Sequence, residues 1–169
     1  MTEFSRPISL ADIDRHRTTH RIDATADEAR ALAERLGVVA VHNLRAELIV
    51  AKRRGAVTVF GTFQTEIEQV CVVTIDPFTT QVSGDIDEVY REIAESEPQA
   101  EVEVDLETPE PLEGDTVDLG ELVVQHLALV IDPHPRAPGA DLADLDAPEE
   151  EGDDLSHPFA SLAKLQQKP

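Results

Sequence analysis

Apolar positions recur with helical spacing in residues 26–36. They stand three or four residues apart, at Ala29, Leu32, Ala33 and Leu36. Thr25 and Glu28 form the pattern of a capping box in front of them, and Gly37 supplies a C-terminal stop. The sequence therefore predicts a short amphipathic helix here.

A second helix is predicted between Asp118 and Pro133. Asp118 is placed to cap the first turn, and Glu121, three residues on, is placed to complete a capping box. Pro133 and Pro135 end the helix, because proline lacks the N–H and disfavours helical geometry in the residue before it. We expect burial on most of its circumference, since apolar side chains stand at Leu119, Leu122, Val123, Leu127, Leu129 and Val130.

The first half of the chain contains segments of strand character. Residues 4–22 mix apolar and basic side chains and are interpreted as an extended arm followed by a first strand. Residues 44–50 alternate between apolar and polar positions and lead into K-R-R-G at 52–55. Such a sequence is typical of a strand that enters a basic hairpin turn.

A longer alternating run predicts a strand over residues 57–75. Its apolar positions share one parity and are Val57, Val59, Phe63, Ile67, Cys71, Val73 and Ile75. Gly61 predicts a bend or break in this strand, and Asp76-Pro77 predicts the turn after it. Cys71 lies on the apolar parity, so we expect it to be a buried side chain without catalytic function.

Two later segments differ in how clearly their pattern defines them. In residues 85–94 helical spacing competes with the extended pattern of the preceding run, because apolar side chains stand at Ile86, Val89, Tyr90 and Ile93. The residues by themselves leave strand and helix open there. Residues 101–107 alternate cleanly and predict a strand that Pro109 and Pro111 end.

The composition indicates one domain and a separate acidic C-terminal segment. Residues 1–136 are interpreted as a single domain, 137–157 as an acidic disordered linker and 158–169 as a short helical motif. Residues 140–155 contain eight carboxylates and no lysine or arginine, which favours disorder. The motif carries apolar side chains that are candidates for docking on the domain or on a partner: Phe159, Leu162 and Leu165.

The net charge of −21 is unevenly distributed along the 169 residues. Residues 1–60 contain ten Lys or Arg against eight Asp or Glu, a net of +2, whereas the remaining residues contain four against twenty-seven, a net of −23. This asymmetry indicates two partners, or one basic partner kept clear of a weakly basic face; a merely solubilising surface is the simpler interpretation. Aromatic residues make up only 4%, with no Trp, which disfavours nucleotide-stacking platforms.

The remaining chemistry argues against an enzyme, a metal protein and a membrane protein. The sequence contains no phosphate-binding or nucleophile-elbow motif, so we expect neither catalysis nor a cofactor. His16 and His20 lie outside a helical pattern, and a single cysteine makes neither an internal disulfide nor a cysteine-based zinc site. His126 is interpreted as a core histidine held by a hydrogen bond. No apolar run exceeds six residues, so a cytosolic protein is expected.

Basic side chains provide the candidates for binding RNA. If the fold brings the early strand and the hairpin turn together, these side chains can neutralise phosphates. The candidates are Arg15, Arg17, Arg21, Lys52, Arg53, Arg54 and Arg136. A soluble turn and protection of an edge strand are the alternative explanation.

Three stretches, at residues 69–78, 117–139 and 157–162, resemble in order and spacing the YceD family of large ribosomal RNA subunit accumulation proteins, in its alphaproteobacterial form. The resemblance implies a non-enzymatic bacterial factor for accumulation of 23S ribosomal RNA, with precursor 23S rRNA or the large-subunit precursor as partner. Many relatives carry a C-x-x-C pair where this chain has only Cys71, so metal binding is not carried over.

The family pattern also favours a strand over residues 79–93. The expected fold is α+β, with a mainly antiparallel sheet packed by the two capped helices. An alternative function is an acidic adaptor or holdase, in which the −23 region holds a basic ribosomal protein.

Overall fold

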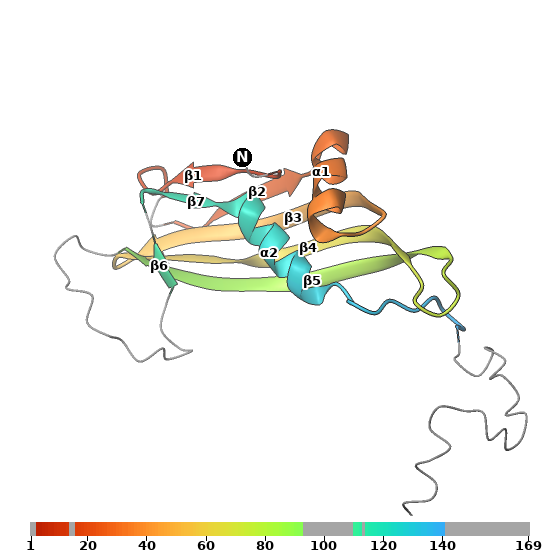
Figure 1. The fold of residues 1–169 in the computed structure, drawn as a ribbon. Coiled ribbons are helices and arrows are strands. Elements are labelled where there is room, and N and C mark those ends of the chain that lie inside the picture. The colour runs from red at the N-terminus through yellow and green to blue at the C-terminus, as the bar shows by residue number, and fades with distance from the viewer. Residues whose placement is uncertain (1–2, 14–15, 93–109, 113, 141–169) are drawn as a thin grey trace, which may run out of the picture. The chain divides into compact units, whose positions relative to one another are not determined.

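The fold combines a five-stranded sheet, a two-stranded sheet and two helices (Figure 1). The computed structural model describes residues 3–13, 16–92, 110–112 and 114–140. Met1–Arg136 form one compact unit and Ala137–Pro169 a second. The expected linker at 137–157 and C-terminal motif at 158–169 lie outside the described residues from position 141 onwards and stay predictions.

The larger sheet has the strand order β2-β3-β4-β5-β6. Its strands pair antiparallel except for β5 and β6, which run parallel. In chain order they are β2 (Thr18–Asp23), β3 (Ala40–Arg53), β4 (Ala56–Val70), β5 (Pro77–Glu92) and β6 (Glu110–Leu112). The smaller sheet pairs β1 (Pro7–Ser9) with β7 (Thr116–Asp118). The mainly antiparallel α+β fold expected from the sequence is therefore confirmed.

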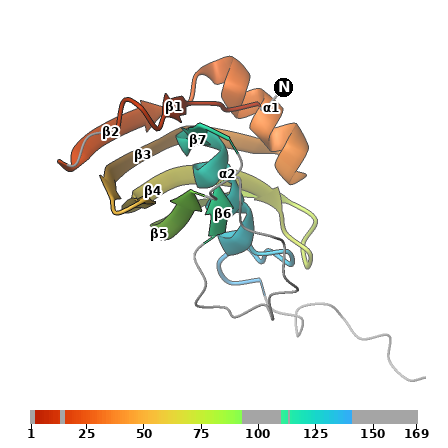
Figure 2. The same cartoon turned by 90° about the vertical axis from the view of Figure 1, so that its left-hand side faces the viewer.

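Both helices, α1 (Ala26–Leu36) and α2 (Leu119–Val130), lie on the same face of the larger sheet (Figure 2). Their apolar side chains and those of the sheet form one core, in which Leu32, Leu48 and Leu127 are completely buried. In the described part of the chain no helix covers the opposite face, so we refer to the two sides as the covered and the uncovered face.

The β3–β4 hairpin lies where the sequence predicted a basic turn at residues 52–55, but the turn itself is only Arg54 and Gly55, and Lys52 and Arg53 still belong to β3. Arg53 pairs with Ala56, and the two residues between them, Arg54 and Gly55, have φ of 53° and 76°. Positive φ at both central residues defines the type I′ turn that suits the twist of a two-residue hairpin. The turn is therefore built by local backbone preference, with the glycine at the position that most needs it.

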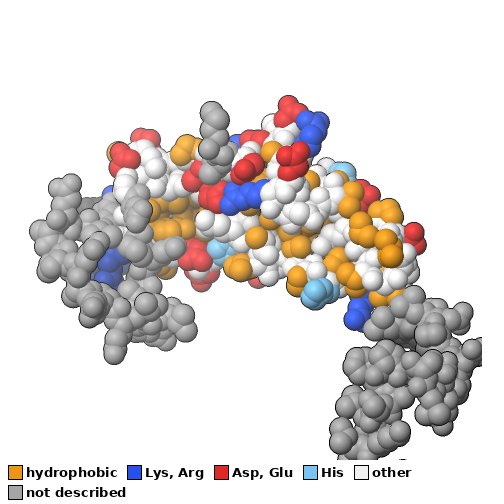
Figure 3. All heavy atoms as spheres, in the orientation of Figure 1, with side chains coloured by type: hydrophobic (Ala, Val, Ile, Leu, Met, Phe, Trp, Pro, Cys, Tyr) orange, Lys and Arg blue, Asp and Glu red, His pale blue; other side chains and the backbone are white. Residues whose placement is uncertain are grey.

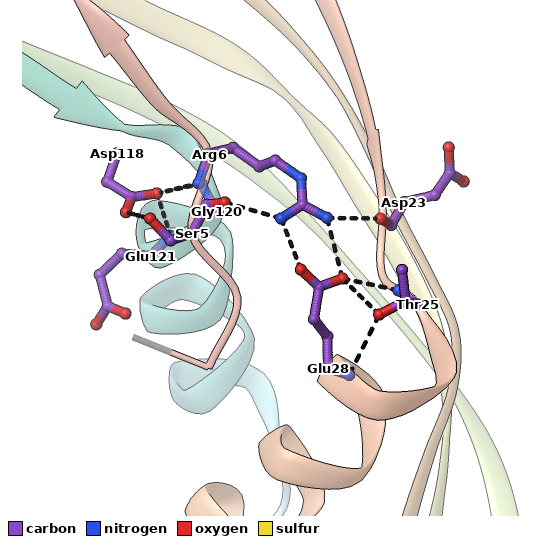
Figure 4. Close-up of polar contacts among 8 residues, drawn as sticks. All are labelled: Ser5, Arg6, Asp23, Thr25, Glu28, Asp118, Gly120 and Glu121. Carbon is purple, nitrogen blue, oxygen red and sulfur yellow. Dashed lines mark hydrogen bonds and ion pairs between the residues drawn. The ribbon is translucent and has the colours of Figure 1, made fainter. Parts of the chain in front are cut away.

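Helix α1 is capped as predicted and is also tied to the N-terminal arm (Figure 4). Thr25 and Glu28 complete the capping box, and Gly37 adopts the left-handed conformation at the C-terminus. The Arg6 guanidinium donates to both carboxylate oxygens of Glu28, at 2.7 and 3.0 Å. This hydrogen-bonded pair lowers the pKa of Glu28 from its ordinary 4.5 to about 2.

We expect Glu28→Gln to lower the free energy of unfolding by about 1–2 kcal/mol at pH 7, because the amide loses a charge-assisted bidentate contact with Arg6. The lowered pKa makes this contribution complete above pH 4.5 and removes it as the pH falls towards about 2. Urea unfolding of both proteins, followed by circular dichroism at several pH values, measures the difference. The exposed pair Arg30–Asp27 supplies the control Asp27→Asn, for which we expect at most about 0.5 kcal/mol. A wild-type advantage that persists unchanged to pH 2 contradicts the assignment.

Asp118 caps α2 and fastens the N-terminal arm to it. Its carboxylate accepts from the backbone N–H of Gly120, Glu121 and Arg6, and from the Ser5 hydroxyl at 2.5 Å (Figure 4). Burial raises the pKa of Asp118, but these hydrogen bonds outweigh it and the net pKa is lowered. The first turn of α2 is thus positioned by residues more than a hundred places away in the sequence.

Of the two residues predicted to form the capping box of α2, Asp118 caps the helix but Glu121 does not take part. Glu121 does not reach back to the cap; its carboxylate accepts from both terminal nitrogens of Arg35 on α1. The tertiary ion pair replaces the local contact because the ends of the two helices come together on the covered face. The hydrogen bond to Arg35 also lowers the pKa of Glu121.

The last turn of α2 departs from the predicted burial. Leu127 is completely buried, but Leu129 is 82% exposed and Val130 46% exposed, because the described residues provide no element that covers this end of the helix. His126 is held by contacts, as expected: its Nδ1 lies 3.1 Å from the carbonyl of Leu122 and its Nε2 lies 3.3 Å from Glu88.

The long strand predicted over residues 57–75 ends at Val70. Residues 71–76 form a turn instead, in which Cys71 is buried and accepts through Sγ from the backbone N–H of Val73 and Thr74. Ile75 has a φ of 63° and is 78% exposed, so it is a turn residue and not a buried position of a strand.

Of the bend or break predicted at Gly61, the break is wrong, because β4 pairs with β3 without interruption there. The irregularity lies in β3, where the register shifts between His42 and Arg45. Gly61 instead permits a close approach of the two strands: a Cβ at this position would meet the carbonyl oxygen of Glu47 and lie 2.9 Å from Cα of Leu48.

The ambiguous segment 85–94 is strand as far as Glu92, where the described residues end. β5 pairs with β4 from Pro77 to Arg91, so cross-strand pairing prevails over the helical spacing of its apolar residues. Pro111 was expected to end a strand but lies inside β6, where a residue without an N–H is tolerated at a sheet edge. The predicted strand at 101–107 falls outside the described residues.

Candidate nucleic-acid interface

Arginines from β3, β5 and the start of β2 gather at the β3–β4 turn. Arg53 pairs with Ala56, which pairs on its other side with Arg91, so both arginines lie in one row across the sheet. Directly paired residues share a face, and this row has the parity of the uncovered face. Arg17 precedes β2 on the same face, about 7 Å along the strands from that row.

The remaining basic residues of the turn extend the charge around the edge of the sheet. Lys52 pairs with the buried Val57 and therefore has the parity of the covered face, whereas Arg54 occupies the turn itself. Lys52, Arg53 and Arg54 line an open concavity of about 790 Å³ together with Leu10 and Ile13. The turn thus presents cations to both sides of the sheet end.

Arg17 lies over the ring of Phe60, with its guanidinium carbon 5.1 Å from the ring centroid. Phe60 stands on the uncovered face of β4, between Ile49 of β3 and Asp87 of β5. Such a cation–π contact positions the guanidinium without neutralising its charge.

Arg21 occupies a different environment on the uncovered face, on the edge strand β2. It donates through Nε to Glu47 at 2.9 Å, and this hydrogen bond raises its pKa. Arg21 and Arg45 line a shallow concavity of about 590 Å³ that also contains Asp23, Glu47 and Asp85. Because carboxylates are interspersed here, this region suits phosphate less well than the turn does.

Other predicted candidates are not brought to the turn. Arg136 is exposed beside the β4–β5 turn, where the carbonyl of Pro135 accepts from the N–H of Val72. The length of β4, which is 15 residues, separates the two turns by about 50 Å. Arg15 and the docking candidates Phe159, Leu162 and Leu165 lie outside the described residues.

Sequence reasoning did not include Arg91 among the candidates. The position of Arg91 could be predicted only if the ambiguous segment was taken as a strand. With 77–92 as a strand paired with β4 across the turn at 71–76, Arg91 lies opposite Ala56. Only a strand over its full length carries this arginine back to the basic turn. We define the basic end of the sheet as Arg17, Lys52, Arg53, Arg54 and Arg91.

The described residues show no sign of a metal site or of a membrane-spanning helix. Among them, no group of three or more His, Cys, Asp or Glu side chains is arranged to hold a metal ion. Nor does any helix in this part of the chain have the length and apolar character that a membrane crossing demands.

These features define an α+β protein whose antiparallel sheet has one uncovered face and a basic end. Residues 59–166 match the family described as "Large ribosomal RNA subunit accumulation protein YceD". The match spans more than half of the chain, so the protein belongs to the YceD family, as the motifs in its sequence indicated. The match includes Phe60 and Arg91 but begins after residues 52–54. Neither the curated proteins nor the solved structures contain a match.

Proposed function

We propose that the protein is a non-enzymatic cytoplasmic factor that supports accumulation of 23S ribosomal RNA by contacting precursor 23S rRNA or the large-subunit precursor through its basic end. The observation that carries this proposal is the convergence of Arg17, Lys52–Arg54 and Arg91 at one end of the sheet. Membership of the YceD family supports the link to large-subunit RNA.

The chemistry of the basic end suits a phosphate backbone. Arginine and lysine side chains that neutralise phosphates release the counterions condensed on RNA, which makes binding depend steeply on salt. If every cation of the basic end contacts one phosphate, the logarithm of the association constant falls with the logarithm of salt concentration with a slope of about −4. The acidic remainder of the chain limits adhesion to other polyanions.

The test is a filter-binding titration of the full chain with transcripts of 23S rRNA segments, from about 50 to about 200 mM salt. We expect measurable affinity and a slope near −4. Sedimentation of cell extracts adds an independent readout, in which the protein should travel with large-subunit precursors. Lack of affinity for every segment, together with absence from the precursor fractions, rules out the proposal.

An acidic adaptor for a basic ribosomal protein is the second candidate, and the opposite end of the sheet favours it. Hydrophobic side chains gather over the β4–β5 turn (Figure 3), where Val72 and Ile75 are exposed. Asp76 and Asp132 are exposed in the same turn and in the segment that packs against it. An apolar surface flanked by carboxylates suits a basic polypeptide with an apolar anchor.

Deleting residues 140–156 separates the two candidates, because this removes eight carboxylates and none of the basic end. The adaptor requires ribosomal-protein partners without direct RNA affinity. Loss of a ribosomal protein from pull-downs of the deletion variant supports the adaptor. If the deletion variant still recovers the same ribosomal proteins and still binds RNA, the result counts against the adaptor and supports the RNA-contacting function.

A further inference from the structure

We propose that Phe60, on the uncovered face beneath Arg17, is a stacking site for one unpaired base of RNA. This inference rests on the proposed function and adds the class of RNA that the basic end takes: a single strand or loop. Its structural basis is the position of one aromatic ring in a face that otherwise carries aliphatic, polar and charged side chains.

The placement of Phe60 differs from that of the other aromatic rings in the described residues. Phe4 and Phe63 are buried in the core, and Phe78 and Tyr90 have the parity of the covered face. Among the described Phe and Tyr side chains, Phe60 alone belongs to the uncovered face, half-buried between Ile49 and Asp87. Packing of the core therefore does not account for an aromatic side chain at this position.

The surroundings of the ring match what a stacked base requires. Every nucleobase has a π-face, so a half-buried ring with an apolar flank such as Ile49 offers it a platform. The Arg17 guanidinium is planar and also stacks on bases, so ring and guanidinium together offer two stacking surfaces. The Phe60 ring itself is uncharged, so its contact with the base is a stacking contact and not an ionic one.

The charged side chains around Phe60 indicate where the sugar–phosphate backbone of the bound RNA strand lies. Arg53 and Arg91 lie on the same face towards the β3–β4 turn and attract phosphates. Asp87, directly opposite Phe60 on β5, repels phosphate but accepts hydrogen bonds from exocyclic amino groups of bases. The backbone therefore follows the arginines while a base lies over the ring. A duplex cannot bind in this way, because its bases are already stacked on one another.

The low aromatic content of the chain had disfavoured such a site. Composition counts rings, whereas a single stacked base needs only one ring on an open face beside cations. The competing explanation is that Arg17 merely shields Phe60 from water. That explanation requires no change in RNA affinity when the ring is replaced by an aliphatic side chain.

The experiment compares the full-length wild type with Phe60→Leu and Phe60→Tyr. The probes are a fluorescein-labelled single-stranded oligoadenylate and an RNA duplex of the same length. We expect Phe60→Leu to weaken single-strand binding about tenfold, while Phe60→Tyr keeps it and duplex binding is unchanged. Because stacking releases no counterions, the salt slope of Phe60→Leu should equal that of the wild type.

The control is Phe78→Leu, which removes a ring from the covered face at the other end of the sheet and should leave RNA binding unchanged. Thermal unfolding verifies that each variant is folded at the assay temperature. Single-strand affinity unchanged by Phe60→Leu, or an equal loss for the single strand and the duplex, overturns the stacking site alone. A wild type that binds neither probe nor any 23S segment overturns the stacking site, and if it is also absent from the precursor fractions it overturns the proposed function as well.

Discussion

Reversal of Lys52, Arg53 and Arg54 to Glu is expected to lower the affinity for 23S rRNA transcripts by about 100- to 500-fold at about 0.1 M salt. The estimate follows from losing three phosphate contacts, each of which contributes about 0.7–0.9 to the salt slope. The slope should accordingly fall by about 2–3. Filter binding across a salt series measures both quantities on the same samples.

The control for this reversal changes exposed charges away from the basic end. Arg30 lies on α1, and Arg136 lies beside the β4–β5 turn; replacing both with Glu makes the chain more acidic without touching the β3–β4 turn. We expect that double variant to lose much less affinity and to keep the slope. If the triple reversal binds like the wild type, the turn does not contact RNA.

Gly61→Ala is expected to destabilise the protein by about 3 kcal/mol or more, at the upper end of the range for overpacking. The added methyl would meet the backbone of Glu47 and Leu48 in the paired strand, and backbone in the middle of a sheet cannot move aside as a side chain does. Since typical domains are stable by about 5–15 kcal/mol, this loss is a large share of the total. Urea unfolding followed by circular dichroism measures it.

Gly84→Ala supplies the comparison for that variant. A Cβ at Gly84 would lie 2.7 Å from two atoms of the Phe63 ring, which is a side chain able to shift. We expect a smaller loss, of about 1–2 kcal/mol. Equal losses at Gly61 and Gly84 would show that the close approach of β3 and β4 is not the source of the effect.

Elements defined by local chemistry were predicted at their correct positions, although the basic turn is shorter than predicted, with Lys52 and Arg53 still in β3. The first helix begins at the Thr25 capping box and ends at Gly37, since both signals act through backbone groups within a few residues. The basic turn formed between Arg53 and Ala56 for the same reason. In these cases the sequence neighbours of a residue are also its spatial neighbours.

Predictions failed where the spacing of residue types did not reveal what each side chain would contact. Glu121 has the local pattern of a capping box, but Arg35 offers its carboxylate a bidentate ion pair. Ile75 has strand parity, but the turn closed by Cys71 and Asp76 ends the strand first. Leu129 has the spacing of a buried position, yet no described element reaches it.

The candidate site shows the same division. The sequence identified the basic turn and Arg17, because clustered charges are visible without a fold. Arg91 joined them only through the hairpin of β4 and β5, whose register places it beside Ala56. Phe60 likewise became a candidate stacking site only through the fold, since its position in the strand matters only once one face of the sheet is known to be uncovered.

By itself, the sequence determined the capped first helix, the basic hairpin, the acidic second half and the kinship with the YceD family. Each of these depends on residue type and short spacing. Only the tertiary structure decided which arginines meet, that Asp118 ties the N-terminal arm to α2, and which face of the sheet stays open. These outcomes depend on strand register and helix placement. Such long-range contacts are set by the packing of the whole core rather than by any local stretch of residues.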